Sequence, residues 1–161
     1  MRGPAFAQIS CAILHKGTMT AHGVAERLGG MKTLKREVRS DLDLVDAIQD
    51  GLPTRALEEV LRSGLLEAAE IYSLVVPRRT LAHRKEKRQA LSPDESDRLT
   101  RVVRVAGRAE EALGDREAAA RWLRKPNRSL EGKRPIDLLE SDVGARMVER
   151  VLGRIEHGVI G

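Results

Sequence analysis

The chain is poor in the residues that build sheets. Aromatic residues make up only 2% of its 161 residues, so the core must be aliphatic. Runs of alternating β-branched residues are absent, which argues against strands. Leu, Val, Ile and Ala recur instead at helical spacing, and the sequence therefore predicts an all-α fold.

Disulfide and membrane signals are equally scarce. The single cysteine, Cys11, excludes an internal disulfide framework and fits a reducing cytoplasm. The mildly apolar segment 5–14 is too short to span a membrane. Gln8 and Ser10 also interrupt it, so it makes a poor signal peptide. We therefore expect a cytoplasmic protein with no membrane partner.

No pattern in the chain is typical of an enzyme. None of the four histidines lies in an HExxH motif, and neither a GxxxxGK[ST] loop nor a GxSxG turn is present. Adjacent carboxylates such as Glu110 and Glu111 point in different directions on a helix. We therefore predict a binding protein without catalytic residues, metal site or cofactor.

Helix signals divide the chain into three segments. Residues 1–39 carry scattered glycines and little periodicity, which predicts a flexible or partly ordered N-terminal arm. Residues 40–90 contain short helices joined by tight turns, and the first follows a capping box at Ser40-Asp41-Leu42-Asp43. Residues 92–161 begin at the clearest helix start, Ser92-Pro93-Asp94-Glu95. Each module is small, so the two should pack together or rely on oligomer contacts.

A basic cluster occupies the last short helix of the first module. The helix before it, the tight turn at Pro77 and the basic helix itself have the layout of a helix-turn-helix. Arginine can pair with guanine, and Lys or Arg can contact phosphates. Expected DNA contacts are Arg78, Arg79, Thr80, His83, Arg84 and Lys85. A solvated basic face is the alternative interpretation.

The last third of the chain combines a shaped turn, an amphipathic helix and an apolar tail. Pro126-Asn127 and Gly132 form the turn, and Pro135 can begin a new helical turn. Gly158 then ends the final helix, and the two aliphatic residues that follow it can dock into a partner's groove. A frayed terminus is the alternative interpretation.

These motifs resemble the Xre/MbcA/ParS family of antitoxins. The resemblance rests on Ser92-Pro93-Asp94-Glu95-x-Asp97-Arg98-Leu99, on Ala109-Glu110-Glu111-Ala112-Leu113-Gly114-Asp115, and on Trp122-Leu123-x-x-Pro126-Asn127-x-x-Leu130-x-Gly132-x-x-Pro135. Residues 40–90, with their Arg79-Thr80-Leu81-x-x-Arg84 run, resemble the Xre-like helix-turn-helix domain that precedes the toxin-binding domain. The resemblance implies an N-terminal helix-turn-helix module followed by a C-terminal helical toxin-binding domain at 92–161.

The resemblance also implies a function. Such antitoxins bind a RES-domain toxin that degrades NAD⁺, obstruct its active site with their C-terminal segment, and autoregulate their operon through operator DNA. They usually self-associate, so a homodimer within a larger hetero-oligomer is expected. NAD⁺ belongs to the toxin, and no cofactor is implied for this chain. Expected toxin contacts are Arg150, Arg154, Glu156, His157, Gly158, Val159 and Ile160.

Two other functions remain open from the sequence. The first is a stand-alone helix-turn-helix regulator whose C-terminal domain only dimerises. The second is a helical adaptor without DNA affinity. Binding that weakens steeply with salt would distinguish a DNA-binding protein from the adaptor, because phosphate contacts release counterions.

Overall fold

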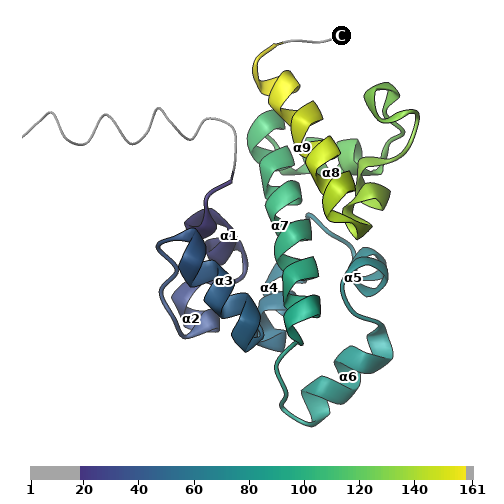
Figure 1. Cartoon of the computed structure of the whole chain (residues 1–161). Coiled ribbons are helices and arrows are strands. Elements are labelled where there is room, and N and C mark those ends of the chain that lie inside the picture. Colours follow the sequence, from purple (N-terminus) through teal and green to yellow (C-terminus); the bar gives the residue numbers. More distant parts are fainter. Residues whose placement is uncertain (1–18, 159–161) are drawn as a thin grey trace, which may run out of the picture.

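The computed structural model describes residues 19–158, and this part of the chain is helical without strands (Figure 1). The predicted all-α fold is confirmed. The α-helices are α1 (Ala21–Arg27), α2 (Gly30–Leu34), α3 (Asp41–Asp50), α4 (Thr54–Arg62), α5 (Ala68–Leu74), α6 (Arg78–Glu86), α7 (Pro93–Leu113), α8 (Arg116–Arg124) and α9 (Asp142–Glu156). Two 3-10 helices, η1 (Arg128–Leu130) and η2 (Pro135–Glu140), lie between α8 and α9.

Helix α7 is the axis against which α1, α3, α5, α8, α9 and η2 pack. Its start matches the sequence signal, because Ser92 and Glu95 form a complete capping box and Pro93 occupies the first turn. Gly114 ends it in the left-handed conformation, at φ 71°. The helices α1 to α3 lie on one side of α7, and α8 and α9 lie on the other (Figure 1).

The core is aliphatic, as the shortage of aromatics requires. Leu99, Val102 and Val105 of α7 are completely buried, and α9 adds Val148 and Leu152 from the opposite side. No helix within residues 19–158 is long and apolar enough to cross a membrane.

The segment 19–39 differs from the arm that the sequence suggested. Val24 and Leu28 of α1 are 1% and 0% exposed, so α1 belongs to the core. The adjacent glycines Gly29 and Gly30 have positive φ angles of 99° and 59°, and they let the chain turn from α1 into α2. Gly107 of α7 leaves room for the Met19 and Arg27 side chains, since a Cβ atom there would lie within 3 Å of both.

The turn ahead of α9 is built as its sequence predicted. The Asn127 side chain accepts a hydrogen bond of 2.9 Å from the Ser129 N–H, and Gly132 takes a positive φ of 78°. Pro135 then begins η2. Leu130, from η1, is 1% exposed, so this turn is anchored in the core of the C-terminal module.

Two glycines of α9 give a test of this packing. A Cβ atom at Gly144 would overlap the Leu138 carbonyl oxygen and lie 2.9 Å from its carbon, whereas one at Gly153 would meet nothing nearer than 3.9 Å. We expect Gly144→Ala to lower the free energy of unfolding by about 1–3 kcal/mol through overpacking. Gly153→Ala should raise it by about 1 kcal/mol through helix propensity. Urea unfolding of both variants measures the difference, and equal effects would contradict this packing.

Candidate functional site

Helices α5 and α6 flank the tight turn that the sequence analysis interpreted as part of a helix-turn-helix. The turn between them is held in the core, because Val75 and Val76 are 1% and 0% exposed. Leu81 is buried, so one side of α6 faces the core. No side chain caps the N-terminus of α6 at Pro77, so its first backbone N–H groups remain available to an anion such as phosphate.

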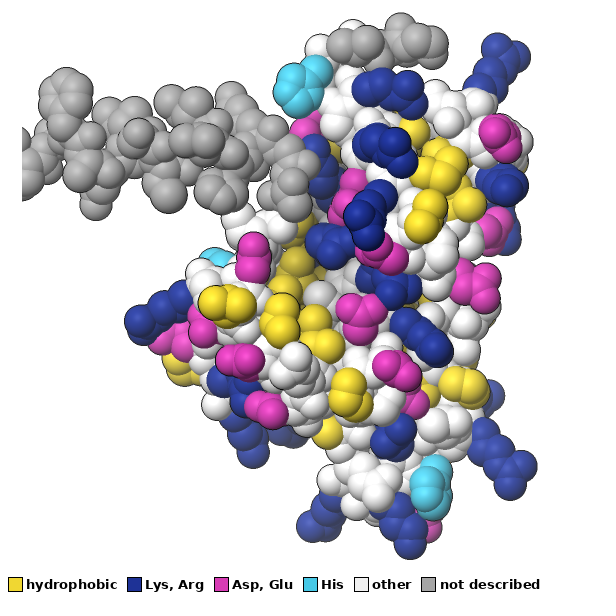
Figure 2. Space-filling model, viewed as in Figure 1, with side chains coloured by type: hydrophobic (Ala, Val, Ile, Leu, Met, Phe, Trp, Pro, Cys, Tyr) yellow, Lys and Arg dark blue, Asp and Glu magenta, His cyan; other side chains and the backbone are white. Residues whose placement is uncertain are grey.

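The basic residues of α6 fall into two groups. Arg78, Arg79 and His83 are exposed and form no ion pair within residues 19–158, and Thr80 beside them is half-buried. Lys and Arg side chains gather with a histidine at the α6 end of the molecule (Figure 2). Exposed cationic side chains of this kind can contact a nucleic-acid backbone.

Arg84 and Lys85 are engaged within the protein. The Arg84 Nη2 atom donates a hydrogen bond of 3.2 Å to Glu95 Oε1, and its Nη1 donates one of 3.2 Å to the Ala90 carbonyl. The Nε atom lies 2.8 Å from Glu95 Oε2 but is not aligned for a hydrogen bond. The Lys85 ammonium lies 2.7 Å from Glu58 Oε1. Because Glu95 also caps α7, Arg84 fixes α6 to the start of that helix.

The expected toxin contacts lie at the other end of the molecule, on α9 (Figure 1). Arg150, Arg154 and His157 are exposed, and Gly158 ends the helix with a positive φ of 68°. Arg150 and Arg154 border a groove of about 440 Å³ between α9 and η1. Val159 and Ile160 lie outside the described residues.

Glu156 turns inward, unlike the other residues of this group. Its Oε2 atom accepts a hydrogen bond of 2.7 Å from Nη2 of Arg108 on α7. The Arg108 side chain is 3% exposed, which makes it a buried cation paired with the last residue of α9. The pair therefore fixes the end of α9, and the point at which the tail begins, against the central helix.

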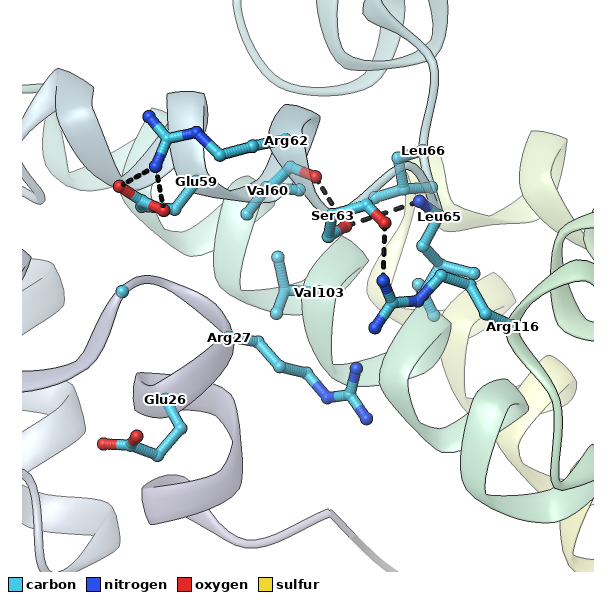
Figure 3. A pocket seen from close by; sticks show the side chains of 12 residues that line it. Glu26, Arg27, Glu59, Val60, Arg62, Ser63, Leu65, Leu66, Val103 and Arg116 are labelled. Atoms are coloured by element: carbon cyan, nitrogen blue, oxygen red, sulfur yellow. Dashed lines mark hydrogen bonds and ion pairs between the residues drawn. The ribbon is translucent and has the colours of Figure 1, made fainter.

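A crevice of about 330 Å³ marks the junction of α1, α4, α7 and α8 (Figure 3). Beside it, Arg27 and Arg116 hold the Glu110 carboxylate from two sides, at 2.5 and 2.9 Å. Burial by itself would raise the pKa of Glu110, but the hydrogen bonds from both arginines outweigh burial and hold this pKa below its ordinary value. The crevice is lined by neither histidine nor cysteine, and we assign it to the joint between helices.

A second joint connects α8 with the helix-turn-helix and was missed from the sequence. Arg124 donates hydrogen bonds of 2.7 and 2.9 Å to the Glu70 carboxylate and one of 3.3 Å to the Leu65 carbonyl. The hydrogen bonds to Glu70 raise the pKa of the Arg124 guanidinium above its ordinary value. No local pattern could pair these residues, because 54 positions separate Arg124 from Glu70.

Two family models match the chain. Residues 43–104 match the antitoxin Xre-like helix-turn-helix domain, and residues 108–158 match the antitoxin Xre/MbcA/ParS C-terminal toxin-binding domain. The two ranges meet inside α7, whereas the sequence motifs placed the boundary ahead of Ser92. Ser92 does precede the start of α7, but α7 contributes residues to both matched domains.

Characterised relatives carry antitoxin names. The chain is 35% identical over 122 residues to Antitoxin Xre of Pseudomonas putida, covering 76% of each chain. It is 34% identical over 118 residues to Antitoxin Xre of Yersinia enterocolitica, covering 72% of this chain and 80% of the relative. It is also 25% identical over 155 residues to the Prs ADP-ribosylating antitoxin of a Sphingobium species, covering 90% and 96%. All three names describe antitoxins, in agreement with the sequence interpretation.

The two groups of basic residues predict different mutant phenotypes. We expect Arg79→Ala to weaken DNA binding by about 1–3 kcal/mol with little change in the melting temperature, because its side chain is exposed. Arg84→Ala should instead lower the free energy of unfolding by about 1–3 kcal/mol, since it leaves the buried Glu95 without its partner. Fluorescence anisotropy with operator DNA and thermal unfolding measure the two effects. Arg121→Ala, on the exposed face of α8, is the control. A stable Arg84→Ala protein would contradict the structural role.

Proposed function

Because the chain belongs to the Xre family of antitoxins, we propose that it neutralises a RES-domain toxin that degrades NAD⁺ and represses its own operon. The observation that carries the proposal is the exposed end of α9, where Arg150, Arg154 and His157 precede the tail within the toxin-binding domain. A tail leaving this point can enter and obstruct a cleft in a partner.

The DNA-binding part of the proposal rests on α6. Its exposed Arg78, Arg79 and His83 lie at the opposite end of α7 from the start of the tail (Figure 1). One molecule can therefore present one end to operator DNA and the other to a toxin. We further propose that the protein acts in the cytoplasm as a homodimer within a larger complex with its toxin.

The proposed chemistry of the toxin is supported by one relative. The Sphingobium protein is named a Prs ADP-ribosylating antitoxin, and ADP-ribosylation consumes NAD⁺. A toxin that acts on NAD⁺ is therefore the best candidate partner for the present chain, and no cofactor is needed on the antitoxin itself.

Co-expression with the product of the neighbouring gene tests the proposal directly. We expect the two proteins to purify together through a tag on either partner, and NAD⁺ to be preserved only when this chain is present. A loss of NAD⁺ that this chain fails to suppress, without a stable complex, would overturn the antitoxin function. It would favour the stand-alone transcriptional regulator, for which salt-sensitive operator binding is the measurement.

Removal of residues 158–161 tests the role of the tail. The deletion takes away no described side chain of the core, since α9 ends at Glu156 and is held there by Arg108. We expect the deletion to abolish inhibition of NAD⁺ loss, because it removes the segment that we propose to obstruct the active site of the toxin. Operator affinity and melting temperature should stay unchanged. An equal loss of toxin inhibition and DNA binding would show that the deletion unfolds the domain.

A further inference from the structure

The exposed face of α9 carries apolar and cationic residues in one line. Val143, Met147, Arg150 and Arg154 follow one another at spacings of four, three and four residues, which places them on a single stripe of the helix. Val143 is 67% exposed and is one of the few large aliphatic side chains left in solvent within the described residues. We call these four residues the α9 stripe.

A groove runs beside the α9 stripe. Its apolar lining comes from Met147 and Val151 of α9 and from Leu130 of η1, and Arg150 and Arg154 stand at its rim. Figure 2 shows Lys and Arg side chains aligned along α9 next to a group of hydrophobic side chains. The same surface therefore offers a hydrophobic contact and a positive charge to one partner.

The charges of the stripe are free, unlike those of neighbouring arginines. Arg104 pairs with Glu149, and Arg146 pairs with Asp142. By contrast, Arg150 donates only a long hydrogen bond of 3.4 Å to the Arg146 carbonyl, and neither it nor Arg154 has an acidic partner within residues 19–158. In a domain that pairs most of its arginines, two free guanidinium groups beside an apolar groove indicate an external carboxylate.

We infer that the α9 stripe is a docking site for a segment of the toxin that carries aliphatic residues next to Asp or Glu. This inference rests on the proposed function and extends its contact from Arg150 and Arg154 along α9 to Met147 and Val143. The stripe supplies affinity, because it combines apolar burial with charge pairing on a rigid helix. The tail supplies inhibition, because it is the segment that we propose to obstruct the active site of the toxin. Binding and inhibition are then separable properties.

DNA fits this surface less well than an acidic protein segment. Phosphate groups can pair with Arg150 and Arg154, but they give no reason for Val143 to be exposed on the same line as the partly buried Met147. The basic helix α6 also lies at the opposite end of α7 (Figure 1). A duplex bound along α6 would therefore be far from the stripe.

Charge reversal at the stripe tests the inference. We expect Arg150→Glu with Arg154→Glu to raise the Kd for the toxin by about 100-fold or more, and Val143→Asp to raise it by about tenfold. The tail deletion should retain the complex while losing inhibition. Titration of catalytically inactive toxin against full-length antitoxin gives Kd, and NAD⁺ consumption by active toxin gives inhibition.

Three controls make the test decisive. Arg121→Glu with Lys125→Glu makes the same change of net charge on α8 and should leave the Kd unchanged, since both residues are exposed on another element. Arg150→Gln with Arg154→Gln removes the charge with little effect on helix stability, and it should also weaken binding. Melting temperatures confirm that each variant is folded.

Several results would overturn the inference. An unchanged Kd for both the Glu and the Gln pairs would show that the toxin does not contact the stripe. An equal loss for the α8 pair would show a general effect of charge. A loss of operator affinity with retained toxin binding would assign the stripe to DNA. If the unmodified antitoxin itself forms no complex with the toxin, the proposed function fails first, and that outcome is visible without any variant.

Discussion

Burial of α7 on several sides is the constraint on which the rest of the structure depends. The other helices are short and could not be stable alone, because helix formation carries a high nucleation cost. With only 2% aromatic residues, the chain has few large side chains with which to build separate cores. Leu99, Val102 and Val105 of α7 are completely buried, so this helix contributes to a core that the helices on both of its sides share. The helix-turn-helix and the toxin-binding domain thus become parts of one body.

Ion pairs then connect the two ends of the molecule to that core. Arg84 joins α6 to the cap of α7, Arg108 joins α7 to the last turn of α9, and Arg124 joins α8 to α5. Each arginine is at least partly shielded from solvent, and loss of one partner would leave a charge in a poorly hydrated position. Such pairs contribute more to the orientation of the short helices than to the free energy of unfolding. Part of the charge of this chain, which has 33% charged residues, therefore serves the fold.

Local signals in the sequence predicted local features well. The capping box at Ser92, the glycine at the end of α7 and the proline at the start of η2 each depend on neighbouring residues, and each occurs where expected. The prediction for residues 19–39 did not anticipate α1 and α2, because Gly29 and Gly30 were interpreted as breakers and they instead form the turn between two buried helices. Arg84 and Glu156 were expected at binding surfaces because the local sequence did not show that each is paired within the fold. Their partners, Glu95 and Arg108, are distant in sequence or lie on another helix, so only the fold reveals the pairs.

Paired arginines hold elements of the fold together, whereas free arginines remain available to a partner, and this difference is not visible from charge alone. Arg84 and Arg79 belong to the same basic run, yet one is held by Glu95 and the other faces solvent. On α9, Arg146 has an acidic neighbour one turn away and Arg150 has none. A free arginine on a rigid helix has no internal contact to lose when a partner binds, so its full charge is available for recognition. Since the free arginines of α6 and α9 lie at opposite ends of α7 (Figure 1), the proposed contacts with operator DNA and with the toxin fall on separate surfaces of one molecule.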